Sequence, residues 1–380
     1  MRERAVTAGR PAAPRYGTGT LADLAASLLA AVGVPGAANA LDLPERPRAC
    51  LLLIDGLGWE LLRAHEADAP FLASLAAEGR VLSAGFPATT ATSLASLGTG
   101  LPPGEHGLVG IQFAVPGVEG LLQCLRWRAE DADPAVVQPR PTVYERAAAA
   151  GVSTGYVASG AYRGSGLSLA TARGADYVPG DSLGQLVAEA GRVLAGADRA
   201  YVTVYHSDLD STGHRFGAGS PHWRHQLRFA DLLAERLADV LPPGTSMYVT
   251  ADHGMVNPTR HVDADRVPAL CEGVAELGGE PRARHVYALP GAAADVLAAW
   301  RETLAGEAWV VTREEAVDAG WFGPVAPQVL PRVGDVVAVP NADLAIVARE
   351  TEPLMSSLVG MHGSLTPAEQ LVPLLAVHRE

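Results

Sequence analysis

The sequence predicts an α/β protein with a three-layer α/β/α core, a mostly parallel central sheet and a small inserted α+β subdomain. Continuous apolar runs at 49–54, 200–205 and 246–251 have the pattern of strands that are buried on both faces. Helix-like segments alternate with these runs, as is typical of parallel sheets.

The order of these segments suggests how the chain is divided. Residues 1–254 and 343–380 are expected to form the catalytic core, with the irregular stretch 107–141 as a candidate cap loop. The sequence pattern changes over residues 255–342. We expect this stretch to form the inserted subdomain, with strands at 285–289 and 309–312 flanking a helix at 291–304. We expect 343–348 to resume a core strand and 371–377 to form the last strand.

The first forty residues could be mistaken for a signal peptide. Arg2, Arg4 and Arg10 precede an apolar run from Leu21 to Val34. However, the run starts late, Asp23 interrupts it, and its apolar residues share one helical face. We therefore expect an amphipathic helix packed on the domain, and no stretch reaches the length of a membrane span.

Composition limits the partners and the compartment. The formal charge is −13, from 42 acidic and 29 basic residues, which argues against affinity for a nucleic acid duplex. A small phosphorylated substrate would then need metal ions as local positive charge. Cys50, Cys124 and Cys271 have no metal-ligand spacing, so we expect buried thiols and a cytoplasmic location. The oligomeric state is not indicated.

Asp55 follows the first apolar run, in Asp55-Gly-Leu-Gly58. A carboxylate at the carboxyl end of a central parallel strand faces the crevice where such sheets bind ligands. The alternative is that Asp55 caps a helix beginning near Trp59.

The stretch from Phe86 to Gly107 places hydroxyls at the start of a short helix. A helix N-terminus favours an alkoxide or a phosphate oxygen, so we interpret Thr90 as a nucleophile. Its hydroxyl would need a base or a metal ion. Thr89, Thr92 and Ser93 compete for the roles of nucleophile and helix cap, and one of them is expected to cap the helix.

Carboxylates and imidazoles near the predicted strand ends could supply those metal ions. Asp210 and His214 are four residues apart, and both can reach one ion from a helical turn. Asp252 and His253 precede Gly254, which permits the strand to break there, and His362 lies in a further loop. With Asp55 these groups suit two ions. Three imidazoles favour Zn²⁺ over Mg²⁺ or Ca²⁺, with Mn²⁺ as the alternative.

The motifs together resemble the alkaline phosphatase superfamily, most closely its nucleotide pyrophosphatase/phosphodiesterase branch. They are Ile54-Asp-Gly56, the Thr90 helix with Thr99-Gly-Leu-Pro-Pro-Gly-Glu-His-Gly107, Asp210-Ser-Thr-Gly-His214, Asp252-His-Gly-Met255 and Met361-His-Gly363. The resemblance implies hydrolysis of phosphoric diester or pyrophosphate bonds through a covalent phospho-threonine at Thr90. It also implies two zinc sites, one formed by Asp210, His214 and His362, the other by Asp55, Thr90, Asp252 and His253.

One position that would contact the substrate differs in this chain from the family that it resembles. Nucleotide-cleaving members resemble one another in an aromatic residue directly after the nucleophile, where this chain has Ala91. Tyr162 and Trp127 are candidates to replace it, and Arg126 is a candidate for a polar contact from the cap loop. Ser93 is expected to donate a hydrogen bond to the phosphoryl group.

Three alternatives remain open. Phosphonate P–C hydrolysis and phosphomonoester hydrolysis belong to the same superfamily, and a non-catalytic phosphate-binding protein is the third. A diester is favoured over a monoester because two divalent ions would be balanced by three carboxylates and one alkoxide, and because no arginine clamp for a dianion is evident.

Overall fold

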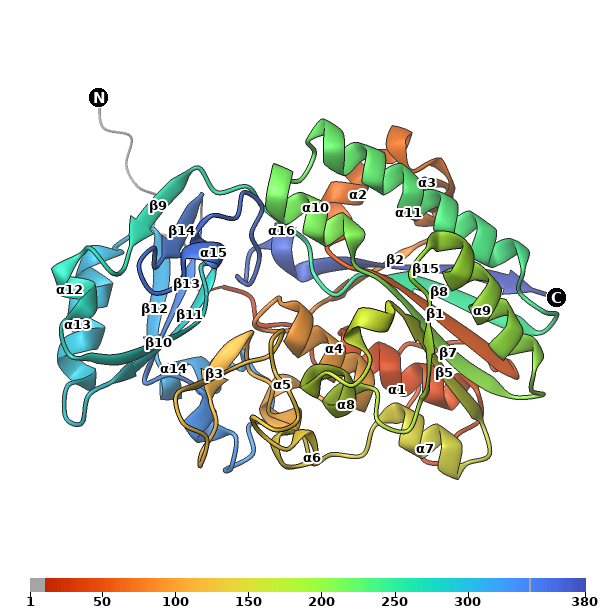
Figure 1. Ribbon diagram of the computed structural model, residues 1–380, viewed down its shortest axis with the longest axis horizontal. Helices are drawn as coiled ribbons and strands as arrows, with labels where there is room; N and C mark the ends of the chain where they lie inside the picture. Colours follow the sequence, from red (N-terminus) through yellow and green to blue (C-terminus); the bar gives the residue numbers. More distant parts are fainter. Residues whose placement is uncertain (1–10, 342) are drawn as a thin grey trace.

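A seven-stranded sheet forms the centre of the protein in the computed structural model, which describes residues 11–341 and 343–380 (Figure 1). The strand order is β2-β15-β8-β1-β7-β5-β6. The strands span Arg48–Ile54 (β1), Arg80–Ser83 (β2), Ser153–Ala158 (β5), Asp176–Pro179 (β6), Ala200–His206 (β7), Thr245–Thr250 (β8) and Leu371–Arg379 (β15). Only β15 runs against the others. The predicted fold class, with its mostly parallel sheet, is confirmed.

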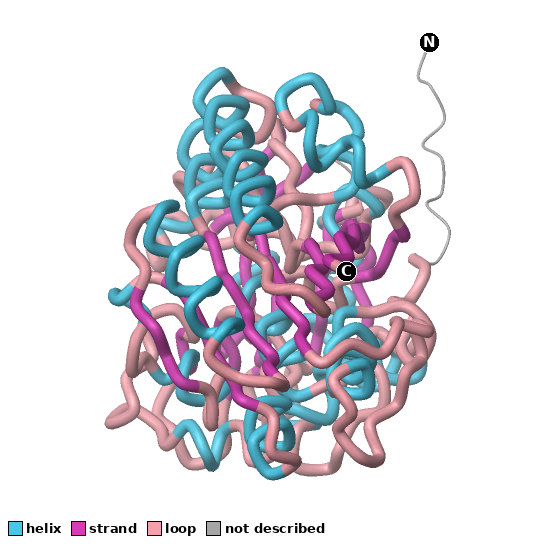
Figure 2. The backbone as a smooth tube through the Cα atoms, turned by 90° about the vertical axis from the view of Figure 1, so that its right-hand side faces the viewer, coloured by secondary structure: helices cyan, strands magenta, loops and turns pink. Residues whose placement is uncertain are grey.

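Helices cover both faces of this sheet (Figure 2). One layer contains α1 (Leu21–Ala31), α4 (Thr90–Thr99), α7 (Val143–Ala149) and α8 (Gly166–Thr171). The opposite layer contains α2 (Trp59–Ala64), the 3₁₀ turn η1 (Glu66–Asp68), α3 (Pro70–Ala76), α9 (Leu183–Ala195), α10 (Asp208–Phe216) and α11 (Pro221–Asp239). Because both faces are covered, the central strands are apolar throughout: six of the seven residues of β1 are buried.

A four-stranded sheet lies beside the larger one (Figure 1). Its order is β10-β11-β13-β12, with bounds Val274–Glu280, Ala283–Ala288, Val336–Pro340 and Ala308–Thr312. Both β11 and β12 are antiparallel to β13, so they run parallel to each other and α13 (Ala293–Thr303) connects them. The sequence indicated β11, α13 and β12, but not β10 or the intervening β13. The division of the chain into domains stays a prediction.

The expectation that 343–348 resumes the central sheet is wrong. A strand does form there, but β14 (Leu344–Val347) pairs in parallel with β9 (Arg260–Asp263) as a separate two-stranded sheet. Leu344 and Ile346 are buried in the apolar core of the smaller sheet. An apolar run shows that a strand is buried, but it does not show which core buries it.

The remaining elements are short. Within 107–141 the chain forms the hairpin β3 (Gln112–Ala114) and β4 (Leu121–Gln123), then α6 (Pro134–Val137). The others are α5 (Pro103–His106), η2 (Gly160–Tyr162), α12 (Pro268–Cys271), α14 (Arg313–Asp318), η3 (Leu330–Arg332), α15 (Pro353–Ser356) and α16 (Pro367–Gln370).

The N-terminal apolar run forms helix α1, which packs on the domain as expected. Its start is fixed by a capping box between Thr20 and Asp23, and Leu21, Leu24 and Leu28 are fully buried. The arginines at positions 2, 4 and 10 lie outside the described residues. Across 11–341 and 343–380, no helix combines the length and apolarity needed to cross a bilayer.

The three cysteines are free thiols, but not all are buried. Cys50 and Cys124 are buried as expected, whereas Cys271 is exposed. The expectation fails at Cys271 because α12 is a single short turn that buries only Leu270.

A buried ion pair joins the smaller sheet to the larger one. Arg282, in the turn between β10 and β11, donates to both carboxylate oxygens of Glu369 in α16, at 3.0 and 2.6 Å. Neither side chain is more than 1 % exposed. Glu369 Oε1 also accepts the main-chain N–H of Ser364 at 3.0 Å, next to the loop that carries His362.

We expect Arg282→Ala to destabilise the protein by about 3–5 kcal/mol, because it leaves Glu369 charged and buried without its partner. The measurement is the free energy of unfolding in urea. Arg260→Ala is the control, because Arg260 pairs with Glu307 while 58 % exposed, and should cost less than about 1 kcal/mol. Equal effects of the two variants would contradict this account of the junction.

Candidate functional site

Three neighbouring strands deliver the acidic residues to one edge of the sheet. Strand β1 pairs in parallel with β7 on one side and β8 on the other, so the carboxyl ends of all three lie together. Asp55 follows β1, Asp210 lies in helix α10 just after β7, and Asp252 follows β8. All three are buried. Asp55 does not cap a helix, because Gly58 is the N-cap of α2.

Thr90 is the first residue of helix α4, and its Oγ1 lies 3.2 Å from His253 Nε2. The prediction that a hydroxyl caps this helix is wrong, since Thr89 at the N-cap makes no capping hydrogen bond. Its hydroxyl donates instead to Glu280 Oε2 at 3.2 Å. Ser93 is fully buried and donates to the main-chain oxygen of Asp252 at 2.7 Å, so in this structure its proton is not free for the predicted phosphoryl contact.

Asp210, His214 and His362 form a first cluster in which one ligand atom from each lies within 4.8 Å of the others. His214 Nε2 is 3.2 Å from Asp210 Oδ2 and 3.3 Å from His362 Nε2. The Nδ1 atoms contact carbonyl oxygens, of Gly360 for His214 and of Ala88 for His362. A carbonyl can only accept, so Nδ1 carries the proton and Nε2 of each ring is directed to the cluster.

Asp55, Asp210 and His253 form a second cluster within the same limit, so Asp210 belongs to both. His253 Nε2 is 3.4 Å from Asp55 Oδ1 and 3.2 Å from Asp252 Oδ2. The other oxygen of Asp252 accepts the main-chain N–H groups of Gly56 and His253, both at 3.0 Å. These hydrogen bonds orient Asp252 Oδ2 toward the cluster.

The donor set fits divalent cations. Asp55 Oδ1, Asp210 Oδ1 and Asp252 Oδ2 are buried and make no hydrogen bond, which is costly for carboxylates unless a cation is bound. Carboxylate oxygens and imidazole nitrogens are ligands that Zn²⁺ and similar ions accept. The two clusters therefore give candidate positions for two ions that share Asp210.

The pKa values of these groups in the metal-free protein reflect their burial and their closeness to one another. Burial, together with the charges of Asp252 and Asp210, raises the pKa of Asp55 well above its usual range. Burial also acts to raise the pKa of Asp210, but the neighbouring His214 and His362 lower it overall. Burial acts to lower the pKa of His214, yet Asp210 raises it to about 9. For His362, burial and then the charge of His253 lower the pKa well below its usual value.

Two residues of the site were missed by the sequence reasoning. The hydroxyl of Tyr205, at the end of β7, donates to Asp55 Oδ2. Its place near the end of a central strand is a signal that could have pointed to it. Glu280 ends β10 of the smaller sheet and reaches Thr89, with Oε2 also 3.7 Å from His362 Nδ1. Nothing in its local sequence indicates that contact.

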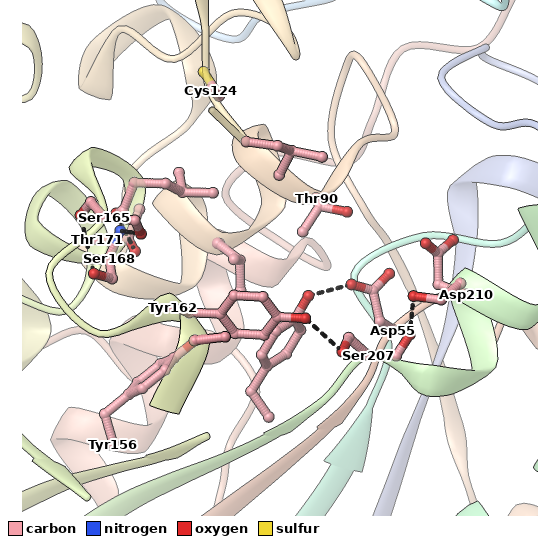
Figure 3. A pocket seen from close by; sticks show the side chains of 16 residues that line it. Asp55, Thr90, Cys124, Tyr156, Tyr162, Ser165, Ser168, Thr171, Ser207 and Asp210 are labelled. Carbon is pink, nitrogen blue, oxygen red and sulfur yellow. Dashed lines mark hydrogen bonds between the residues drawn. The ribbon is translucent and has the colours of Figure 1, made fainter. Parts of the chain in front are cut away.

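A pocket of about 230 Å³ opens beside Thr90, Asp55 and Asp210 (Figure 3). Tyr162 lines it, is 39 % exposed, and lies with its hydroxyl 2.9 Å from Ser207 Oγ. Trp127 does not line it: the indole is 2 % exposed, packs on Gly166 and donates to Ala132 O at 2.8 Å. Arg126 is exposed and also lies outside the lining. Of the three predicted substrate contacts, only Tyr162 is at the pocket.

Comparisons with known proteins agree with this geometry. The family model for type I phosphodiesterase/nucleotide pyrophosphatase matches residues 49–365. The fold is similar to that of murine ectonucleotide pyrophosphatase/phosphodiesterase 5, with a TM-score of 0.69 and 19 % identity over 88 % of each chain. An inactive variant of that protein, in complex with AMP, matches equally well, with a TM-score of 0.69 and 19 % identity over 87 % of this chain and 88 % of that one.

Phosphonoacetate hydrolase from Sinorhizobium meliloti 1021, in complex with phosphonoformate, also has a TM-score of 0.69. Its identity is 18 %, over 88 % of this chain and 91 % of that one. At these identities the likeness is one of fold. No curated protein sequence matches the chain significantly.

We expect Gly56→Ala to disturb this site. Gly56 has φ +75°, and a Cβ there would lie 3.1 Å from Asp210 Cβ. The backbone conformation alone costs about 1–3 kcal/mol for a residue with a side chain, and Asp210 must shift. The readouts are the free energy of unfolding and the affinity for divalent metal, both of which should fall.

Gly184→Ala is the matched control for that variant. Gly184 lies in helix α9 with open space around its Cβ position, so alanine should be neutral or stabilise by about 0.5–1 kcal/mol. A Gly56→Ala protein with unchanged stability and metal affinity would contradict the assigned contact.

Proposed function

Because the chain belongs to the type I phosphodiesterase/nucleotide pyrophosphatase family, we propose that it hydrolyses phosphoric diester or pyrophosphate bonds with two bound divalent metal ions. The observation that carries the proposal is the convergence of three hydrogen-bond-free carboxylate oxygens on the imidazoles beside the Thr90 hydroxyl. Such a concentration of buried negative charge next to a nucleophilic group suits phosphoryl transfer assisted by cations.

The first proposed ligand set is the first cluster, whereas the second set keeps Asp55 and His253 of the second cluster, adds Thr90 and Asp252, and leaves Asp210 to the first ion. Asp210, His214 and His362 would hold one ion, and Asp55, Thr90, Asp252 and His253 would hold the other. Zinc is favoured because three of the proposed ligands are imidazoles, with manganese as the alternative. When bound, these ions supply positive charge that neutralises the phosphoryl oxygens and lowers the pKa of a nearby hydroxyl.

Thr90 is the proposed nucleophile. Its Oγ1 attacks phosphorus in line with the leaving oxygen, so a bond from Thr90 Oγ1 to phosphorus forms as the ester bond breaks. The leaving oxygen departs as an alcohol after gaining a proton. Water then attacks the phospho-threonine from the opposite side, which releases a phosphomonoester and restores the hydroxyl. The contact of His253 Nδ1 with the Gly254 carbonyl, at 3.0 Å, keeps His253 Nε2 beside Thr90 Oγ1.

Phosphonate hydrolysis is the second candidate, since the fold is also similar to that of phosphonoacetate hydrolase. Release of phosphate from phosphonoacetate by the metal-loaded protein would favour it. A phosphomonoesterase is disfavoured because no arginine lines the pocket to neutralise a dianion. A non-catalytic phosphate-binding protein would bind these ligands tightly without any turnover.

We expect Thr90→Val to lower kcat/KM for bis-p-nitrophenyl phosphate by at least about 10³-fold, because the nucleophile is removed. Thr90→Ser keeps a hydroxyl and should retain part of the rate. Mass spectrometry of acid-quenched protein should find phosphate on residue 90 in the wild type only. Full activity of the valine variant would exclude the proposed role, and a faster rate on p-nitrophenyl phosphate would overturn the diester preference.

We expect about two equivalents of zinc or manganese per chain by elemental analysis, and about one in His214→Ala, because the first cluster loses a ligand. Chelation should abolish hydrolysis, and added metal should restore it. His225→Ala is the control, since His225 is exposed on helix α11. If His214→Ala keeps the full metal content, the first ligand set is wrong.

A further inference from the structure

Among residues 11–341 and 343–380, none that lines the pocket beside the candidate metal site carries a positive charge. None of the residues that line it is an arginine or a histidine, and the chain has no lysine. Asp55 and Asp210 form its inner end. The charge of two divalent metal ions would be balanced by the three carboxylates together with the Thr90 alkoxide, so the ions leave no surplus charge for a second anionic group on the substrate.

Three of the hydroxyl groups in the pocket wall are oriented as hydrogen-bond acceptors. Ser168 Oγ donates to Ser165 O at 3.0 Å, Thr171 Oγ1 to Leu167 O at 2.9 Å, and Ser211 Oγ to Ser207 O at 3.1 Å. A hydroxyl has one proton and two lone pairs. With their protons bonded to main-chain oxygens, these side chains present lone pairs, which suit a ligand that carries hydrogen-bond donors and repel a carboxylate or phosphate.

The surroundings of the pocket add negative charge. A second hollow shares Tyr162, Tyr205 and Ser207 with it, and is lined by Asp181 and Asp208. These two carboxylates add negative charge on the side of the pocket where the shared residues lie, which is unfavourable for an anion. The lining also contains Leu94 and Leu125, which can contact the carbon skeleton of a ligand.

We propose that this pocket takes an uncharged, hydroxyl-bearing ester group, so that the substrate is a phosphodiester of a small polyol rather than a molecule with a second phosphate or carboxylate. The volume of about 230 Å³ suits a small group. The inference rests on the proposed function and narrows it, because it disfavours pyrophosphates and phosphonoacetate, each of which would bring a second anionic group to the site.

The test compares three methyl phosphodiesters whose second ester group is glyceryl, propyl or 3-carboxypropyl. The methyl group is kept small so that the second group occupies the pocket. Consumption of each diester by the metal-loaded protein is followed by ³¹P NMR. We expect kcat/KM to be at least about tenfold higher for the glyceryl than for the carboxypropyl diester, with propyl between them. A carboxypropyl rate equal to or above the glyceryl rate overturns the inference.

Two variants show whether the pocket is responsible. Leu125→Arg places a cation at the rim, where Leu125 is 59 % exposed, and should raise the carboxypropyl rate relative to the glyceryl rate by about tenfold. Leu354→Arg is the matched control, because Leu354 is 65 % exposed on α15 and does not line the pocket. Ser168→Ala removes one acceptor and should lower the preference for glyceryl over propyl. Unchanged preferences in Leu125→Arg and Ser168→Ala also overturn the inference.

Measurements of binding affinity distinguish a failure of this inference from a failure of the proposed function. Calorimetry with Thr90→Val and the same diesters measures affinity without turnover. If no diester is hydrolysed but the glyceryl compound binds most tightly, the proposed catalysis fails and the pocket assignment stands. If the diesters are hydrolysed with no preference and bind equally, the catalysis stands and the pocket assignment fails.

Discussion

The structure depends on three aspartates being held close together away from water. Asp55, Asp210 and Asp252 each leave one buried oxygen without a hydrogen bond. Isolated carboxylates in this environment would be strongly unfavourable, and the raised pKa of Asp55 records that burial. The imidazole of His214, whose pKa Asp210 raises to about 9, offsets part of the charge. Cations would offset the remainder, so the stability of the fold and the binding of metal are linked.

The parallel sheet is what makes this crowding achievable. Strands β1, β7 and β8 are neighbours and end at one edge, so three segments far apart in the sequence deliver an aspartate each to one place. A further candidate ligand, His362, comes from a loop that the central sheet alone does not hold in place. His362 is fixed by the Ala88 carbonyl, and the loop after it is fixed by Glu369, whose partner Arg282 belongs to the smaller sheet. The smaller sheet thus supports the site from outside the core.

The central strands and most metal-ligand candidates could be predicted because local patterns encode them. An apolar run followed by Asp55 or Asp252 predicts both the strand and the residue that lies at its end. The pairing of β14 with β9, and the contact of Glu280 with Thr89, depend on long-range packing that no local pattern records. The placement of Trp127 and Ser93 differs from the expected one for a related reason. Residue type suggested stacking or donation, but neighbouring backbone groups already occupy their polar atoms.

Strand β15 lies between β2 and β8, inside the central sheet rather than at its rim. It also follows directly on the segment that carries His362. During synthesis on the ribosome, β2 therefore has no partner strand in the seven-stranded sheet until β15 emerges and inserts. A nascent chain would have the complete set of proposed ligands only once His362 had been made, so any metal site that needs His362 forms after that point.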